Sequence, residues 1–451
     1  MAHERSWVLH VVRRRAGTTQ PERRQTVKAL QSRPAAALLA GIALILGALG
    51  ALVAVGPALA ADAGSTYVAL SPTRILDTRD GTGRGGVSGP IPAGGTVDLT
   101  VTGLAGVPAT GVEAVTLNVT ATNGTALDSY LTVFPSGAIR PLASNLNFNA
   151  GKTVPNLVMA RVGNGGKVTI YNNSGTADVV ADLQGWYASP INALGSRYVA
   201  LEPARMLDTR VGVGAPSGPV PGGGVVELTL GGRGGVPESG VTAVVLNVTA
   251  VGATGPDSFV TVYPTGTERP LASNLNVSPG QTVPNAVVAR VNNGKVSLYN
   301  NRGEVHLIAD VQGWFKAQTD PLGAVSSYNP VAPVRALDTR DGTGTGGVSG
   351  QMGPGGVVIL QVAGRNGIPS DGVTAVVLNV TVTNPTGPDS FLTVYPAPSL
   401  RPLASNLNFG RNQTVANLVV ARVGPTGAVA LYNNLGAVHM VADVQGWFHA
   451  I

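Results

Sequence analysis

Aspartates that recur in three parts of the sequence are the first candidates for chemistry. Asp77 and Asp182 have counterparts in both later copies, and such carboxylate pairs can serve as the general acid and general base of a hydrolase. Arginines accompany them in every copy, and an aspartate held by arginine stays ionised, which makes it a poor general acid. We therefore predict a buried or half-buried Arg–Asp network that fixes strand ends. Its members are Asp77 and Arg79, Asp208 and Arg210, and Asp338 and Arg340.

Other catalytic chemistries find little support in the sequence. After residue 60 the only histidines are His306, His439 and His449, so the first copy has none. A Ser–His–Asp site in every copy is therefore excluded, and no Gly-x-Ser-x-Gly elbow occurs. The chain has no cysteine, which excludes zinc–thiolate, iron–sulfur and thiol chemistry. An extracellular hydrolase with a single site between copies is the least favoured alternative.

Residues 77–83 have the composition of a calcium-binding loop. They read DTRDGTG but lack the alternating oxygen ligands of an EF-hand. The second copy also has Val211 where the first has Asp80. A turn is the better interpretation, so we expect no cofactor, with calcium as a minor alternative.

The string RPLASNLN occurs at residues 140–147, 269–276 and 401–408 and supplies a second kind of candidate site. In a strand, its two asparagines face opposite to its second leucine. The last strand of each copy likewise aligns an Asp, a Gln and a Trp. A tryptophan beside amides is typical of a sugar-binding platform, in which the ring stacks on a pyranose. The candidate ligand face comprises Asn145, Asn147, Asp182, Gln184, Trp186, Asn274, Asn276, Asp310, Gln312, Trp314, Asn406, Asn408, Asp443, Gln445 and Trp447.

These tryptophans also have a structural explanation. Burial of one Trp side chain under the end of a sandwich removes roughly 200 Å² from water and stabilises a fold by up to ~5 kcal/mol. That alone accounts for one Trp in each copy, and duplication preserves neutral residues as well. We therefore favour a structural role over binding. The leucine and phenylalanine face of RPLASNLN is expected to fill the core, and its asparagine face to pair with a polar layer.

The elements that must position these residues are strands. LDTR, LNVT, Tyr-Asn-Asn and Gln-Gly-Trp recur in the same order in each copy, and the Asp of LDTR recurs at 77, 208 and 338. Between them lie alternating runs such as 257–264, separated by Gly, Pro and Asn turns. Seven or eight short strands in ~125 residues are typical of an antiparallel sandwich. We predict three tandem jelly-roll-like β-sandwich modules at residues 61–187, 197–315 and 327–449, joined by short linkers.

The N-terminal segment accounts for the net charge of +6. Residues 1–34 carry eight Arg and Lys against two Glu, and the rest of the chain is balanced, which excludes nucleic-acid binding. Residues 35–56 contain no charged side chain, and Ala58-Leu59-Ala60 follows. This pattern predicts one hydrophobic helix within a secretory signal, residues 35–60, that is cut after Ala60. The alternative is an uncleaved membrane anchor.

The ordered motifs LDTR, LNVT, RPLASNLN, YNN and DVQGW resemble a ~130-residue β module of secreted and surface proteins of actinobacteria. The resemblance covers residues 66–449, although Val277 replaces the Phe of the other two copies. It implies an extracellular β module and no reaction. Our first expectation is a secreted or cell-surface, non-enzymatic repeat protein in envelope structure or adhesion. The second is a multivalent protein whose partner is cell-wall or extracellular polysaccharide, with membrane contact only through residues 35–56 if they are uncleaved.

Overall fold

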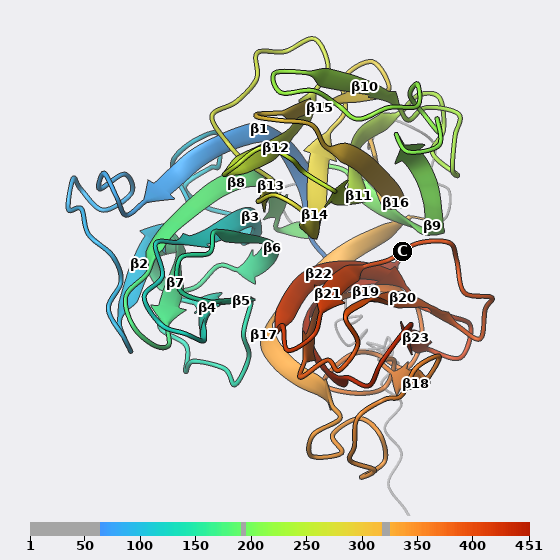
Figure 1. The fold of residues 1–451 in the computed structure, drawn as a ribbon. Helices are drawn as coiled ribbons and strands as arrows, with labels where there is room; N and C mark the ends of the chain where they lie inside the picture. Colours follow the sequence, from blue (N-terminus) through green and yellow to red (C-terminus); the bar gives the residue numbers. More distant parts are fainter. Residues whose placement is uncertain (1–63, 191–194, 318–324) are drawn as a thin grey trace, which may run out of the picture. The chain divides into compact units, whose positions relative to one another are not determined.

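The computed structural model describes residues 64–190, 195–317 and 325–451, and these residues are all-β, as predicted (Figure 1). A short 3₁₀ turn, Asn164–Gly166, also occurs among them. The predicted basic segment 1–34 and the predicted hydrophobic helix 35–60 lie outside the described residues. No helix within the described ranges is long and apolar enough to cross a membrane.

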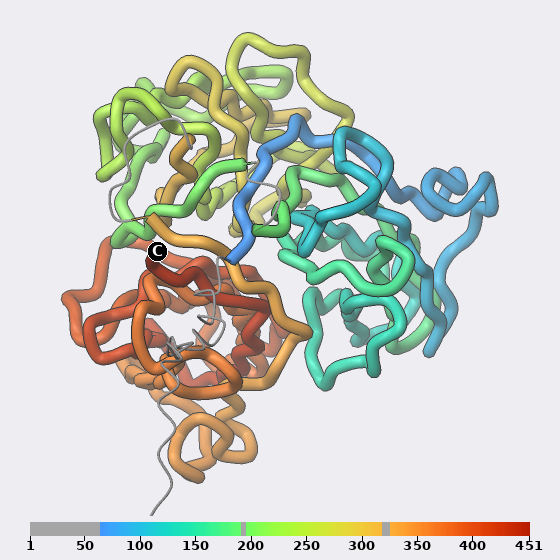
Figure 2. The backbone as a smooth tube through the Cα atoms, turned by 180° about the vertical axis from the view of Figure 1, so that it is seen from behind, coloured from blue at the N-terminus to red at the C-terminus, as the bar shows by residue number. Residues whose placement is uncertain are grey.

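Strands follow one another in the same order in three repeats of the sequence, here called repeat 1 (residues 66–188), repeat 2 (197–316) and repeat 3 (326–450). Figure 2 traces them from blue to teal, from green to yellow-brown, and from orange to red. Repeat 1 contains β1 (Thr66–Asp77), β2 (Thr96–Thr100), β3 (Val112–Thr122), β4 (Ser129–Pro135), β5 (Leu146–Phe148), β6 (Val154–Arg161), β7 (Lys167–Asn172) and β8 (Asp178–Ala188). Repeat 2 contains β9 (Arg197–Asp208), β10 (Val225–Thr229), β11 (Val241–Val251), β12 (Ser258–Pro264), β13 (Leu275–Val277), β14 (Thr282–Arg290), β15 (Lys295–Asn300) and β16 (His306–Lys316). Repeat 3 contains β17 (Ser326–Asp338), β18 (Val357–Gln361), β19 (Val373–Thr383), β20 (Asp389–Ala397), β21 (Leu407–Gly410), β22 (Val415–Arg422), β23 (Ala428–Asn433) and β24 (His439–Ala450).

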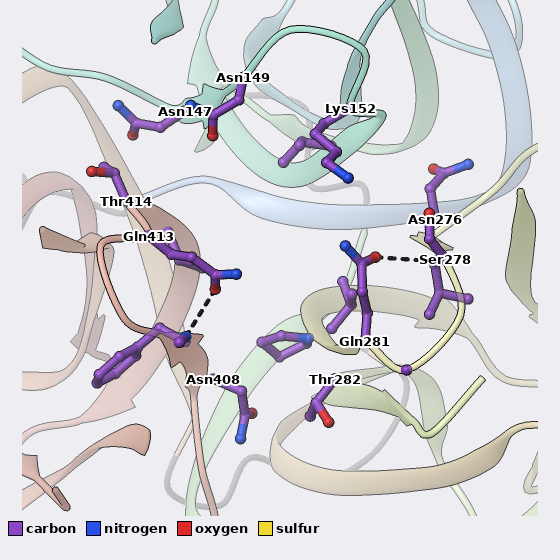
Figure 3. A pocket seen from close by; sticks show the side chains of 18 of the residues that line it. Asn147, Asn149, Lys152, Asn276, Ser278, Gln281, Thr282, Asn408, Gln413 and Thr414 are labelled. Atoms are coloured by element: carbon purple, nitrogen blue, oxygen red, sulfur yellow. Dashed lines mark hydrogen bonds between the residues drawn. The ribbon is translucent and has the colours of Figure 1, made fainter. Parts of the chain in front are cut away.

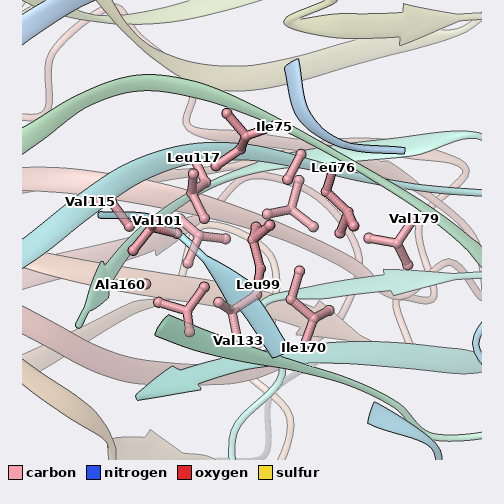
Figure 4. Packing of buried hydrophobic residues seen from close by; sticks show 14 of the residues in the cluster. Ile75, Leu76, Leu99, Val101, Val115, Leu117, Val133, Ala160, Ile170 and Val179 are labelled. Carbon is pink, nitrogen blue, oxygen red and sulfur yellow. The ribbon is translucent and has the colours of Figure 1, made fainter. Parts of the chain in front are cut away.

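Each repeat is a sandwich of two antiparallel sheets. In repeat 1 the strand orders are β1-β8-β3-β6, here called the inner sheet, and β2-β7-β4-β5, the outer sheet. Both orders recur in repeats 2 and 3, where β9 and β17 join the two inner sheets into one eight-stranded sheet. Successive strands alternate between the two sheets, except for β4 and β5, which are neighbours in the outer sheet, as in an eight-stranded jelly roll. Leu117 of the inner sheet packs with Leu99 and Ile170 of the outer sheet in an apolar core (Figure 4).

The inner sheet is buried on both faces, which explains its composition. In β3 the alternation is regular, with Leu117 and Val119 in the core of repeat 1 and Asn118 on the opposite face. Yet Asn118 is as buried as the leucine, because the other repeats cover that second face. A sheet covered on both sides requires a partner for every polar group on it.

A β-bulge at Gln-Gly-Trp interrupts the alternation of the last strand. In β16, Val311 pairs with Leu246 and Gly313 with Val245, so Gln312 is an extra residue. The extra residue shifts the faces by one position. Trp314 therefore lies in the core of repeat 2, beside Val311, and the prediction that it shares a face with Asp310 and Gln312 is wrong.

The glycine of this motif also has a geometric reason. A Cβ atom on Gly313 would lie 2.1 Å from the hydroxyl of Tyr198. That hydroxyl donates a hydrogen bond to the carbonyl of Gln312 at 3.1 Å, across the bulge. The same tyrosine contact recurs with Gln184 and Gln445, so Gln-Gly-Trp encodes a bulge closed by a tyrosine.

Candidate functional site

Six asparagines join the repeats and are here called the amide belt. Asn285 in β14 donates from Nδ2 to Oδ1 of Asn118 in β3 at 2.8 Å, and its own Oδ1 accepts the N–H of Leu157 at 3.2 Å. Asn118 then donates to the carbonyl of Ser273 at 2.6 Å. Every one of these contacts crosses from repeat 1 to repeat 2. The belt comprises Asn118, Asn156, Asn247, Asn285, Asn379 and Asn417, and no member is more than 1% exposed.

The belt contacts form a closed cycle. Asn417 of repeat 3 donates to Asn247 of repeat 2 at 2.9 Å, and Asn156 of repeat 1 donates to Asn379 of repeat 3 at 2.8 Å. Each repeat therefore contacts the next in the same way, and the third contacts the first. Single β-bridges close the same cycle, and they pair Ser65 with Tyr328, Tyr67 with Ser196, and Ser326 with Tyr198.

Aromatic rings fill the space enclosed by the inner sheets. Tyr67 lies 4.4 Å from Phe315, Tyr198 lies 4.2 Å from Phe448, and Tyr187 lies 4.3 Å from Tyr328, measured between ring centroids. Each pair joins two repeats, and the rings belong to one buried cluster that contains residues of all three. Because these buried rings pack against one another across the repeats, the three repeats form one packed body.

The predicted ligand face is divided between this interior and a cavity. Asn145, Asn274 and Asn406 are at most 2% exposed, and their Oδ1 atoms accept backbone N–H groups of the adjacent outer-sheet strand at 2.6–2.7 Å. Gln184, Gln312 and Gln445 are equally buried and accept N–H groups of a neighbouring repeat at 3.2–3.3 Å. The structure therefore shows no exposed surface formed by these six amides.

The tryptophans occupy the repeat cores. Trp186 and Trp314 are 3% and 8% exposed, and Trp447 is half-buried against the core of repeat 3. The rings belong to the same clusters as the core leucines and valines. A sugar could not stack on Trp186 or Trp314 in this arrangement.

The remaining carboxylates of that face belong to an Arg–Asp network. In repeat 2, Arg205 contacts Asp310 through Nε and Asp208 through Nη1, the latter at 2.8 Å, and Arg210 contacts Asp208 at 2.8 Å. Arg205 also donates to the carbonyl of Leu403 in repeat 3 at 3.2 Å. The equivalent ion pairs join Arg74 with Asp77 and Asp182, Arg79 with Asp77, Arg335 with Asp338 and Asp443, and Arg340 with Asp338.

The two carboxylates of each network have different acidities. Hydrogen bonds from Arg210 hold the pKa of Asp208 at about 2, whereas burial raises the pKa of Asp310 above its usual range despite the contacts with Arg205. Opposite shifts in one pair are typical of acid–base catalysts. Here, however, both carboxylates are at most 3% exposed, are fully engaged with arginine, and do not line the large cavity described below.

This network predicts a measurable acid sensitivity. The pKa of Asp208 is lower in the folded protein than its ordinary value of 3.8, so its stabilising effect is complete above about pH 4 and is lost as the pH falls toward 2. Asp208→Asn should lower the free energy of unfolding by about 2 kcal/mol at pH 7 and by little at pH 2. Urea unfolding across this range measures the difference. Asp371→Asn, at an exposed position, serves as the control. If the loss of stability in Asp208→Asn does not change with pH, the lowered pKa of Asp208 is contradicted.

Residues 77–83 form a turn. Asp80 accepts the N–H of Thr82 at 2.8 Å, and Asp341 accepts that of Thr343 at 2.9 Å. This is an Asx turn, in which the carboxylate serves the backbone. Among the residues that the structure describes, no cluster of three His, Cys, Asp or Glu side chains could hold a metal ion.

A cavity of about 730 Å³ lies where loops of all three repeats meet, and it contains the part of the predicted face that is not buried (Figure 3). Asn147, Asn276 and Asn408 are half-buried and line it, one from each repeat. Lys152, Gln281 and Gln413 line it as well, and sequence reasoning missed these three. They occupy one aligned position, directly after the turn that follows β5, β13 or β21, but they do not share a residue type, so no repeated motif marks them.

The arginine that opens RPLASNLN lies outside the cavity, over a tyrosine ring of the outer sheet. The guanidinium of Arg140 lies 4.2 Å from the ring centre of Tyr171, and Arg269 and Arg401 stack in the same way on Tyr299 and Tyr432. Such a cation–π contact fixes the loop before β5 on the outer sheet. Most residues of RPLASNLN therefore stabilise the fold, and only its last asparagine lines the cavity.

These observations define an all-β protein of β-sandwiches that interlock through buried amides. No protein-family model and no curated relative matches the sequence. Two solved structures are similar to it, one described as the triple jelly roll fold and turret assembly in an archaeal virus, the other as Sulfolobus turreted icosahedral virus. Each is 10% identical, with a match that covers 85% of this chain and 91% of that chain and has a TM-score of 0.18. A likeness at this level carries no argument about function.

Proposed function

We propose that this chain is a secreted or cell-surface protein without enzymatic activity, with a structural or adhesive role in the cell envelope. In this proposal it consists of three jelly-roll modules, at residues 61–187, 197–315 and 327–449, that act as one rigid unit. Export depends on residues 1–60, which have the sequence of a secretory signal.

The observation that carries the proposal is the use of the recurring polar residues. The asparagines of LNVT, the asparagines that follow Thr-Val-Pro or Thr-Val-Ala, and the glutamines of Gln-Gly-Trp all bond one repeat to another. In an enzyme, recurring polar residues are expected to converge on a place where a substrate can bind. Here they are buried between the repeats and hold them together. This favours a structural role for the protein over a catalytic one.

The carboxylates support the same proposal. Asp77 and Asp182 share Arg74, with contacts of 3.3 Å and 2.9 Å. Burial raises the pKa of the Asp77 carboxylate, but hydrogen bonds from Arg79 outweigh it and leave the pKa below its usual range. Asp77 is therefore ionised and fully paired, and it neither gives nor takes a proton readily near neutral pH. Burial raises the pKa of Asp182, but Arg74 engages both of its oxygens and the residue is only 1% exposed.

Localisation of the protein tests the first part of the proposal. The product should be found in the medium or on intact cells, with Ala61 as its first residue, by mass spectrometry of the supernatant and of peptides shaved from whole cells with protease. A variant without residues 1–60 is the control and should stay inside. Intact product confined to the cytoplasm would overturn the proposal, and a membrane product that retains residues 35–56 would replace secretion by anchoring.

The envelope role is tested in cells that lack the protein. Deletion should reduce attachment to surfaces or resistance to osmotic shock, and the wild-type chain should restore it. The variant without residues 1–60 should fail to restore it, because the role requires export. Restoration by that variant, or an unchanged deletion strain, would contradict an envelope function.

A further inference from the structure

The cavity shared by the three repeats is more than a gap between packed bodies, because it is lined by equivalent polar side chains. Asn147, Asn276 and Asn408 come from the short strands β5, β13 and β21. Thr282, the first residue of β14, and Thr414, in the loop before β22, add hydroxyl groups (Figure 3). Three equivalent amides therefore surround one space.

The asparagine amides are oriented for binding. In each repeat, the serine of RPLASNLN donates to Oδ1 of the last asparagine, at 3.1–3.2 Å. This bond occupies the oxygen and fixes the amide plane. The structure gives Nδ2 of Asn147, Asn276 and Asn408 no partner among the described residues, so three N–H₂ groups remain available to a ligand.

The glutamines are held in the same way. Gln281 accepts the N–H of Ser278 at 3.0 Å, and Gln413 accepts that of Gly410 at 2.8 Å. Their Nε2 groups likewise have no partner among the residues described. The third equivalent position carries Lys152, whose ammonium is also a donor. All three positions therefore present nitrogen donors to the cavity.

The charges in the cavity balance. Lys152 and Arg411 are its basic residues, and Asp257 and Asp389 are its acidic ones. An anionic polymer such as a nucleic acid needs an excess of cations, and this lining has none. The two carboxylates supply acceptors for hydroxyl groups, which complement the amide donors.

Apolar groups complete the lining. Val154, Val283 and Val415 contribute to it from the three repeats, and Phe391 contributes an aromatic ring. Alternating polar and apolar contacts suit a molecule with hydroxyl edges and C–H faces, which describes a sugar ring. A volume of about 730 Å³ falls within the usual range for small-ligand sites, ~300–1,000 Å³.

From this geometry we infer that the cavity binds one neutral oligosaccharide per chain. The site exists only where the three repeats meet, so it is a property of the whole chain and not of a single repeat. The amides of Asn147, Asn276, Asn408, Gln281 and Gln413 donate to sugar oxygens. The inference is independent of the proposed envelope role, since a structural protein without this site would still be exported.

Calorimetric titration of the purified full chain tests the inference. The probes are the neutral hexasaccharides of cellulose, chitin, mannan and starch, with hexagalacturonate as the acidic comparison. At least one neutral probe should bind with one site per chain. The double variant Gln281→Ala and Gln413→Ala should weaken that binding by more than about tenfold, because each amide hydrogen bond is worth roughly a factor of five. Its melting temperature should fall only slightly, because the two turn hydrogen bonds that the glutamines accept are part-buried or exposed.

Two further variants make the result specific. Gln351→Ala removes an exposed glutamine outside the cavity and should leave binding unchanged. Lys152→Gln makes the three equivalent positions identical and should change affinity for a neutral sugar by less than about threefold, since amide and amine are both donors. Failure of all four neutral probes, a preference for hexagalacturonate that Lys152→Gln abolishes, three sites per chain, or an unaffected double variant would each overturn the inference.

Discussion

Asn285→Ala should lower the free energy of unfolding by about 3–5 kcal/mol, because it removes one side chain and leaves several buried groups without partners. Asn285 is 0% exposed and bonds Oδ1 of Asn118, the carbonyl of Asn274 and the N–H of Leu157. Two of these three contacts cross between repeats. Chemical denaturation followed by tryptophan fluorescence measures the loss.

A matched control distinguishes the joint from the residue type. Asn301→Ala removes a half-buried asparagine whose one described side-chain contact is a 3.5 Å bond from Tyr299, and it should cost less than about 1 kcal/mol. The test compares the free energies of unfolding of the two variants. If Asn285→Ala is as stable as Asn301→Ala, the amide belt does not hold the repeats together.

Trp314→Ala should cost a similar ~3–5 kcal/mol, as expected for a large side chain removed from a packed core. The ring is 8% exposed and lies among the leucines and valines of repeat 2. Thermal and urea unfolding of the full chain should both show the loss. Oligosaccharide affinity of the fraction that remains folded should be unchanged, because Trp314 does not line the cavity.

Trp314→Phe is the informative companion variant. The indole Nε1 is buried and has no hydrogen-bond partner, so phenylalanine sacrifices volume but no polar contact. We expect a cost of about 1 kcal/mol, well below that of alanine. A fully stable Trp314→Ala protein that no longer binds sugar would reverse the assignment and restore the tryptophan as a binding platform.

The fold class could be predicted because it depends on local patterns. Alternation in β3 and β16, and turns rich in Gly, Pro and Asn, are sufficient for an all-β sandwich. The same alternation correctly separates Leu117 from Asn118. It cannot say what covers the second face, because that depends on residues more than 150 positions away, such as Ser273, which accepts the bond from Asn118 with a separation of 155.

The errors about the ligand face have two physical causes. A single extra residue, Gln312, moves Trp314 from the polar face to the core, and a bulge leaves no trace in simple alternation. Burial by another repeat then converts Asn145 and Gln184 from apparent binding residues into structural ones. Only Asn147 and its two equivalents, the second residue of each short strand, remain at a cavity. The sequence could not indicate Lys152, Gln281 and Gln413, because loops of three separate repeats create that site.

The closed cycle of contacts between repeats has a consequence for the evolution of this protein's sequence. Three identical subunits joined by the same contacts would form a homotrimer, and any substitution in one gene would appear three times around the axis. In a single chain, each copy can vary alone. The aligned cavity positions have begun to do so, with lysine in one repeat and glutamine in the other two. Because the copies are fused in one chain, a substitution can change the cavity in one repeat only. The cavity can therefore become asymmetric, and its ligand specificity can change, while the amide contacts between the repeats stay the same.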